Sequence, residues 1–79
     1  MTLNDEIIEQ IAERIHVKWM NQRLSEGWNL GKERSDTLKT HPCLVPYNEL
    51  PEVEKEYDRA TARETLATIK EMGYVLTTR

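Results

Sequence analysis

The sequence predicts a mostly helical single domain over residues 1–79, and a minimal pair of extended segments would make it a small α+β fold. A helical period of apolar residues runs up to Gly27, a second helical stretch follows Pro51, and the 23 residues between them have no helical period. A domain of this length buries only about 60–65% of the surface of its unfolded chain. We therefore expect a partner subunit or a neighbouring domain to complete the burial.

The first expected element is a long amphipathic helix. Asn4 or Asp5 would be its N-cap, and Gly27 would end it in the left-handed conformation. Its core face is an apolar stripe about 140° wide at roughly 100° per residue, formed by Ile7, Ile8, Ile11, Ala12, Ile15 and Trp19. A second apolar patch on the far side consists of Val17, Met20 and Leu24. We expect the following loop or a second chain to cover that patch.

Residues 28–50 predict an ordered, irregular segment that wraps over the helices. Gly31, Pro42 and Pro46 interrupt any regular element, and a structureless connection of this length is unusual in a compact domain. We expect apolar side chains to anchor this wrap: Trp28, Leu30, Leu38, Leu44, Val45 and Tyr47. Two weak extended segments, 28–30 and 74–76, would pair as a minimal sheet.

The last helical stretch begins at Pro51 and changes its apolar face. Three acidic residues favour its start, namely Glu52, Glu54 and Glu56. One face carries Val53, Tyr57 and Ala60, and the opposite face carries Ala62, Leu66 and Ile69. A straight helix would need apolar cover on all sides, so we expect a break near 58–61, where Thr61 and Glu64 have capping-box spacing. The prediction is a short helix over 51–57 and a C-terminal helix ending at Met72, with Gly73 as its terminator.

Composition and charge exclude several function classes. The net charge of −3, from 11 basic and 14 acidic residues, does not suit a broad phosphate-binding surface, so we expect no nucleic-acid partner. The chain lacks a run of about 20 apolar residues, the length that a membrane span requires. A single cysteine closes no internal disulfide, and no signal-peptide pattern opens the chain. We expect a cytoplasmic protein.

The stretch His41-Pro42-Cys43-Leu44-Val45-Pro46-Tyr47 is the first candidate for chemistry, because it holds the only cysteine two residues after a histidine. A cysteine nucleophile also needs an orienting group and an oxyanion site, and no such motif lies nearby. A zinc site needs four ligands, and only His16, His41 and Cys43 are soft candidates. We therefore expect no catalytic residue, no metal and no cofactor. Cys43 is interpreted as a buried structural residue, and His41 as a donor to a backbone carbonyl or a carboxylate.

Aromatic residues leave a second function open. The chain has no phenylalanine, so its tryptophans and tyrosines have to build the core, although the same rings can also stack on a planar ligand. The candidate residues for binding a small ligand are Trp28, Arg34, His41, Tyr47, Tyr57 and Arg59.

The order of several motifs resembles the ryanodine receptor repeat domain over about Ile8 to Val75. The motifs are Trp19, the pattern Gly27-Trp28-x-x-Gly31, Asp36, the run HPCLVPYNELPEVEKEYDR, ETL, and Met72-Gly73-Tyr74. This resemblance implies a compact, mostly helical, non-enzymatic module. In the receptors such repeats occur as tandem pairs about a pseudo-twofold axis, and this chain holds one copy. We expect a stand-alone prokaryotic or phage relative without calcium channel function.

The resemblance and the residue pattern both indicate that the chain assembles with a partner. A single repeat would expose the face that a tandem pair buries, so we expect a homodimer or a larger protein partner. The candidate interface residues are Val17, Met20, Leu24, Tyr74 and Leu76. The expected function is a regulatory or protein-interaction module. The alternative is a sensor of a small ligand such as a nucleotide.

Overall fold

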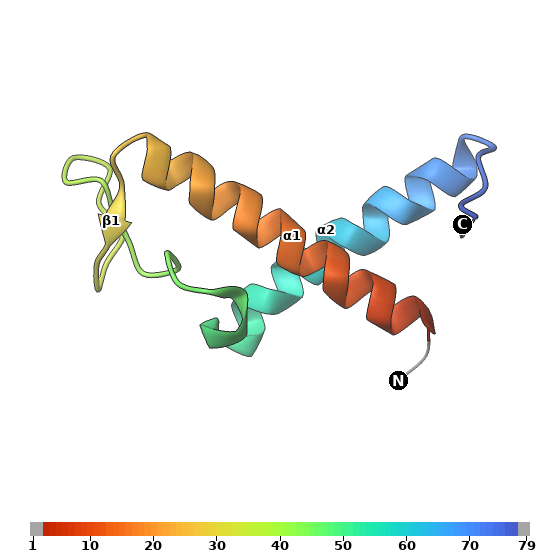
Figure 1. Cartoon of the computed structure of the whole chain (residues 1–79), viewed down its shortest axis with the longest axis horizontal. Helices are drawn as coiled ribbons and strands as arrows, with labels where there is room; N and C mark the ends of the chain where they lie inside the picture. Colours follow the sequence, from red (N-terminus) through yellow and green to blue (C-terminus); the bar gives the residue numbers. More distant parts are fainter. Residues whose placement is uncertain (1–2, 78–79) are drawn as a thin grey trace.

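The computed structural model describes residues 3–77 and has two long helices that cross near their middles (Figure 1). Helix α1 spans Leu3–Ser25 and helix α2 spans Glu52–Glu71. The segment between them contains strand β1 (Asn29–Leu30), strand β2 (Thr40–His41) and the 3-10 helix η1 (Tyr47–Glu49). The prediction of a mostly helical chain with a minimal sheet is confirmed.

Helix α1 ends as predicted but begins earlier. Gly27 has a φ of 90°. The Trp28 N–H donates to the Arg23 carbonyl at 3.0 Å and the Gly27 N–H donates to the Leu24 carbonyl at 3.1 Å, the two bonds of a Schellman motif. The predicted N-cap at Asn4 or Asp5 is wrong, because both lie inside the first turn. An acidic residue such as Asp5 is also favoured within that turn, so Asp5 locates the helix start only to within one turn.

Helix α2 is continuous, so the predicted break near 58–61 is wrong. The Thr61 hydroxyl donates to the Tyr57 carbonyl one turn earlier at 3.1 Å, and does not cap a new helix. Val53 and Tyr57 are 67% and 66% exposed, so their side of the helix needs no apolar cover from this chain. The prediction assumed that every apolar face would be buried.

Helix α2 ends with the same motif as α1. Gly73 has a φ of 90°, its N–H donates to the Lys70 carbonyl at 3.0 Å, and the Tyr74 N–H donates to the Ile69 carbonyl at 3.2 Å. Each glycine is therefore followed by an aromatic residue whose backbone completes the helix end.

Strand β1 pairs in parallel with β2, in the register Asn29 to Thr40 and Leu30 to His41. The predicted pairing of 28–30 with 74–76 is wrong, because residues 74–76 form no strand. Gly31 permits the pairing, since a Cβ at this position would lie 2.6 Å from the Cβ of Thr40. Strands of two residues carry no alternating pattern, so β2 has no signal in the sequence.

The core lies where η1 packs on α1, with Ala12, Tyr47 and Leu50 buried and with Cys43 and Val45 packed against them. Of the predicted anchors of the wrap, Trp28, Leu44 and Tyr47 are buried and Val45 is half-buried. Leu30 and Leu38 are 59% and 73% exposed, so the prediction that they anchor it is wrong. Leu30 ends β1 and Leu38 lies between β1 and β2, in the region after α1 that extends away from α2 (Figure 1).

The molecule is more extended than the resemblance implied. Its radius of gyration is 14.9 Å and its extents are 44 × 25 × 21 Å, whereas a compact domain of this length has a radius of gyration of about 12 Å. Figure 1 shows the cause, since the C-terminal half of α2 projects away from the rest. Within residues 3–77 no large side chain is completely buried. The core of the single chain is therefore open.

Candidate functional site

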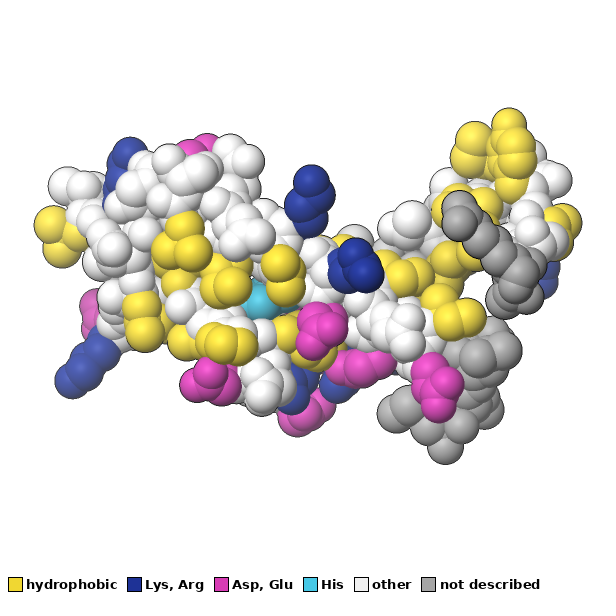
Figure 2. Space-filling view, in the orientation of Figure 1, with side chains coloured by type: hydrophobic (Ala, Val, Ile, Leu, Met, Phe, Trp, Pro, Cys, Tyr) yellow, Lys and Arg dark blue, Asp and Glu magenta, His cyan; other side chains and the backbone are white. Residues whose placement is uncertain are grey.

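A pocket of about 240 Å³ lies between α1, the wrap and the first turns of α2. Its lining residues are His16, Trp19, His41, Cys43, Leu50, Glu54, Tyr57 and Asp58. Figure 2 shows an imidazole in the middle of one face of the molecule, flanked by hydrophobic side chains and with carboxylates nearby. The pocket is therefore lined mainly by aromatic rings and carboxylates.

His16 connects α1 to the wrap. Its ring is only 4% exposed, and its Nε2 lies 2.6 Å from the Val45 carbonyl. Because a carbonyl only accepts, Nε2 carries a proton and donates this bond. The ring also lies 5.6 Å from that of Trp19 and 6.2 Å from that of Tyr47. The sequence marked His16 only as a soft metal ligand, and its long-range contact with Val45 has no sequence signal.

His41 fixes the backbone of the motif that contains it. Its Nδ1 accepts a hydrogen bond from the Cys43 N–H at 3.0 Å, so the predicted donor role is wrong for this nitrogen. Pro42 and Cys43 form a turn, in which the Leu44 N–H donates to the His41 carbonyl at 3.5 Å, and this turn brings the Cys43 amide back to the ring. The His41 ring stands edge-on to Trp19, with centroids 4.9 Å apart. Burial lowers the pKa of His41, with further lowering from Arg34 and Arg23, so the ring is neutral at neutral pH.

Cys43 is half-buried and does not have the environment of a nucleophile. Burial raises the pKa of its thiol, and Glu54 and Asp58 raise it further. A raised pKa keeps sulfur in the unreactive thiol form. Within residues 3–77, no three His, Cys, Asp or Glu side chains are grouped in a way that suits a metal ion.

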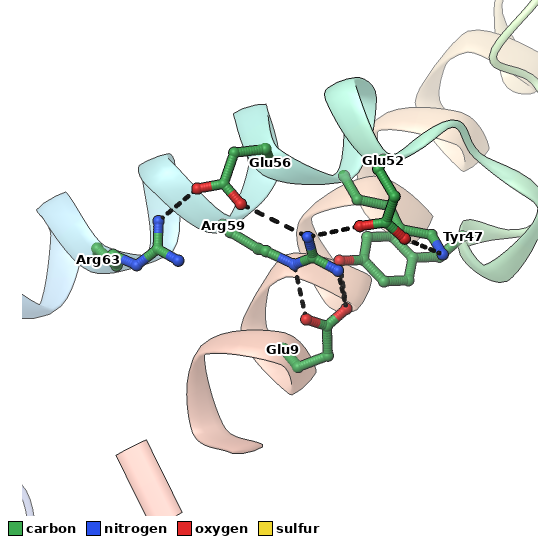
Figure 3. A network of polar contacts seen from close by, with 7 residues as sticks. Glu9, Tyr47, Glu52, Glu56, Arg59 and Arg63 are labelled. Carbon is green, nitrogen blue, oxygen red and sulfur yellow. Dashed lines mark hydrogen bonds and ion pairs between the residues drawn. The ribbon is translucent and has the colours of Figure 1, made fainter. Parts of the chain in front are cut away.

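The second polar feature is a network that joins the two helices, and Figure 3 shows it. Arg59 of α2 donates from Nε to Glu9 Oε2 at 2.7 Å and from Nη2 to Glu9 Oε1 at 3.2 Å. Its Nη1 donates to Glu52 at 3.0 Å. The Tyr47 hydroxyl donates to Glu9 Oε1 at 2.6 Å. One carboxylate on α1 therefore binds both α2 and η1.

Sequence reasoning missed Glu9, although a weak signal existed. Glu9 follows the apolar pair of residues 7 and 8 and lies at the edge of the core stripe, where a carboxylate needs a partner. Its partner Arg59 lies 50 residues away. Nothing in the sequence distinguishes this arginine from the other basic residues as the partner of Glu9. The hydrogen bonds from Arg59 and then Tyr47 lower the pKa of Glu9 below its ordinary value of 4.5.

The six candidate ligand-binding residues lie in four places. His41 and Tyr57 line the pocket, and Tyr47 and Arg59 belong to the network. Trp28 is buried under the Arg23 guanidinium, which lies 4.9 Å from the centre of the ring. Arg34 pairs with Asp36 at 3.2 Å on an exposed loop. The structure thus brings two of the six together at one pocket.

The five candidate interface residues form two separate surfaces. Val17 and Leu24 on α1 are 39% and 50% exposed, and Met20 between them is half-buried. Tyr74 and Leu76, after α2, are 66% and 65% exposed. Figure 1 places the C-terminal half of α1 and the segment after α2 at opposite ends of the long axis.

A family model for the RyR domain matches residues 2–78. The chain belongs to the RyR domain family. RyR domains are non-catalytic repeat modules in the proteins known to contain them, and no enzyme family is evident for this chain. In this RyR domain the HPCLVPY motif supplies half of β2, the His41 and Cys43 lining of the pocket, and the Val45 carbonyl that binds His16. No helix within residues 3–77 has the length and hydrophobicity that a bilayer crossing requires.

Proposed function

We propose that this RyR domain is a non-enzymatic, regulatory protein-interaction module that acts as a homodimer. The observation that carries the proposal is the open core. The chain is more extended than a compact domain of its length, and the C-terminal half of α2 projects without cover. A chain that buries this little apolar surface gains stability from a second copy.

Two apolar surfaces are available for that contact. We define the α1 patch as Val17, Met20 and Leu24, and the C-terminal arm as residues 72–76. In the arm Met72, Tyr74 and Val75 are 66%, 66% and 83% exposed. Exposed apolar groups of this kind are typical of interaction sites when they adjoin one another.

A twofold axis would use both surfaces at once. In a twofold dimer, a patch that contacts a different patch on its partner makes that contact twice. Because the α1 patch and the arm lie at opposite ends of one copy, the arm of each copy would pack on the α1 patch of the other. This arrangement covers the projecting half of α2 without any change in the fold.

The alternative function, a nucleotide sensor, has less support. Its six candidate residues do not converge, and the charged groups of the pocket are carboxylates, which repel a phosphate. A cytoplasmic location stays a prediction of the sequence.

Sedimentation velocity of charge-inserted variants tests the proposed interface. We expect Leu24→Glu in the α1 patch and Leu76→Glu in the arm to weaken self-association at least about tenfold, since each buries an unpaired charge at the contact. The matched control is Leu38→Glu, which changes a leucine that is 73% exposed and lies outside both surfaces. If all three variants associate as the unmodified chain does, the proposed surfaces are wrong.

A further inference from the structure

The pocket between α1, the wrap and α2 holds two carboxylates that form no ion pair within the described residues. Three acidic side chains within residues 3–77 are half-buried, namely Glu9, Glu54 and Asp58. Glu9 is bound by Arg59. Glu54 and Asp58 line the pocket and have no ion pair with any basic residue of the described part.

These two carboxylates share one side of α2, because they are one helical turn apart. They are also close enough to interact, and Glu54 contributes to the raised pKa of Asp58, for which burial is the main cause and which His16 opposes. Two carboxylates that face a confined space without a counter-ion favour a cation there.

His16 adds a third acceptor to the same space. His16 is only 4% exposed and lines the pocket. Its Nε2 donates to the Val45 carbonyl, so Nδ1 is the acceptor when the ring carries this one proton. Nδ1 has no hydrogen bond within the described residues. Every fully buried side-chain polar atom of these residues does have a partner, so Nδ1 is not fully buried and is accessible from the pocket.

The remaining walls are aromatic. Trp19, His41 and the exposed Tyr57 present rings to the pocket. The molecule already places one guanidinium against Trp19, since Arg23 lies 5.9 Å from the centre of that ring and 4.9 Å from that of Trp28. Flat cations that carry several N–H donors suit rings and carboxylates together.

We propose that this pocket binds a guanidinium group. The carboxylates of Glu54 and Asp58 and the Nδ1 of His16 accept its N–H groups, and its plane lies against Trp19 or Tyr57. A guanidinium fits better than a simple ammonium, because its planar fork of donors matches paired carboxylates and stacks on aromatic faces. The site does not depend on the proposed homodimer, so each can fail without the other.

The guanidinium has two sources that share this chemistry, a free alkylguanidinium and an arginine side chain of another protein. Calorimetric titration of the full chain at neutral pH with agmatine and with N-acetyl-arginine amide separates them. Binding of agmatine alone indicates a free small molecule, and binding of both indicates an arginine side chain. The neutral isostere N-acetyl-citrulline amide is the negative control, because it keeps the shape and lacks the charge.

Variants of the two carboxylates test the assignment. We expect Asp58→Asn and Glu54→Gln each to weaken guanidinium binding about tenfold or more, the usual effect of losing a charge-assisted hydrogen bond. The control Glu71→Gln removes the same charge from an exposed position of α2 outside the pocket and should leave binding unchanged. Thermal melts confirm that each variant is folded. The proposal is overturned if neither guanidinium compound binds, if the citrulline compound binds equally well, or if both pocket variants bind like the control.

Discussion

Glu9 of α1 and Arg59 of α2 are joined by two hydrogen bonds of 2.7 and 3.2 Å, and this pair fixes the crossing of the helices. The same carboxylate accepts a bond from the buried Tyr47 at 2.6 Å. Three segments that are far apart in the sequence therefore meet at one side chain. The stability of the single chain should depend on this carboxylate more than on any surface charge.

Replacing Glu9 with glutamine tests that dependence. The Glu9→Gln variant keeps the shape of the side chain but loses its charge, so it weakens the bonds from both Arg59 and Tyr47. We expect a loss of roughly 1 kcal/mol in the free energy of unfolding, because Glu9 is 36% exposed and solvent screens the pair. Urea denaturation measures it. The matched control is Glu13→Gln, an exposed position one turn later, and an equal effect in both variants would contradict the role of Glu9.

The same pair predicts an acid-dependent loss of stability. Hydrogen bonds from Arg59 and Tyr47 lower the pKa of Glu9 below 4.5, so the folded state binds this proton less readily than the unfolded state does. The contribution is present above about pH 4.5 and is lost as the pH falls through the folded-state pKa. The unmodified chain should therefore lose more stability between about pH 5 and pH 3 than Glu9→Gln does.

Asp58 should behave in the opposite sense. Its pKa is raised above 3.8, mainly by burial, so its charge destabilises the folded state at neutral pH and protonation relieves the cost. Asp58→Asn should therefore be at least as stable as the unmodified chain at neutral pH and should lose stability more steeply on acidification. Chemical denaturation across this pH range checks both slopes. A shallower slope for Asp58→Asn than for the unmodified chain would refute this assignment.

The bond between His16 and Val45 should hold the wrap against α1. His16→Phe keeps an aromatic ring but removes the Nε2 donor, which leaves the Val45 carbonyl without its partner. We expect a loss of about 1–2 kcal/mol in the free energy of unfolding, with faster amide hydrogen exchange in residues 40–50 than in α1. Uniform exchange changes along the whole chain would show instead that His16 acts only through general packing.

Replacing Gly31 or Gly27 with alanine should destabilise the fold, with a different physical cause at each position. Gly31→Ala places a Cβ 2.6 Å from the Cβ of Thr40, so the β1–β2 pairing has to open, at about 1–3 kcal/mol. Gly27→Ala meets no atom within 4 Å and costs only its left-handed backbone, about 1–2 kcal/mol. Hydrogen exchange of the Asn29 amide, which donates to the Lys39 carbonyl at 2.8 Å across the two strands, separates them. Only Gly31→Ala should accelerate it.

Features with a local physical cause were predictable from the sequence. Gly27 and Gly73 each end a helix because only glycine adopts their φ without strain, and the aromatic residue after each completes the motif. The polar contacts at the candidate site were not predictable, because Glu9 and Arg59 are 50 residues apart and no local rule pairs them.

The predicted break in α2 was wrong for a different reason. The sequence shows which residues of this helix are apolar, but not that Val53 and Tyr57 are left exposed. A single chain of this length cannot cover every apolar face. The prediction of a break therefore assumed a cover over Val53 and Tyr57 that this chain does not supply.

Sedimentation equilibrium of the full chain over about 10 to 500 μM, well above the micromolar affinity of a weak specific dimer, tests the proposed homodimer most directly. We predict a single monomer–dimer equilibrium that reaches twice the monomer mass, with the monomer recovered in Leu24→Glu. A strict monomer at the highest concentration would contradict the account, and the open core would then have to be covered by a different protein.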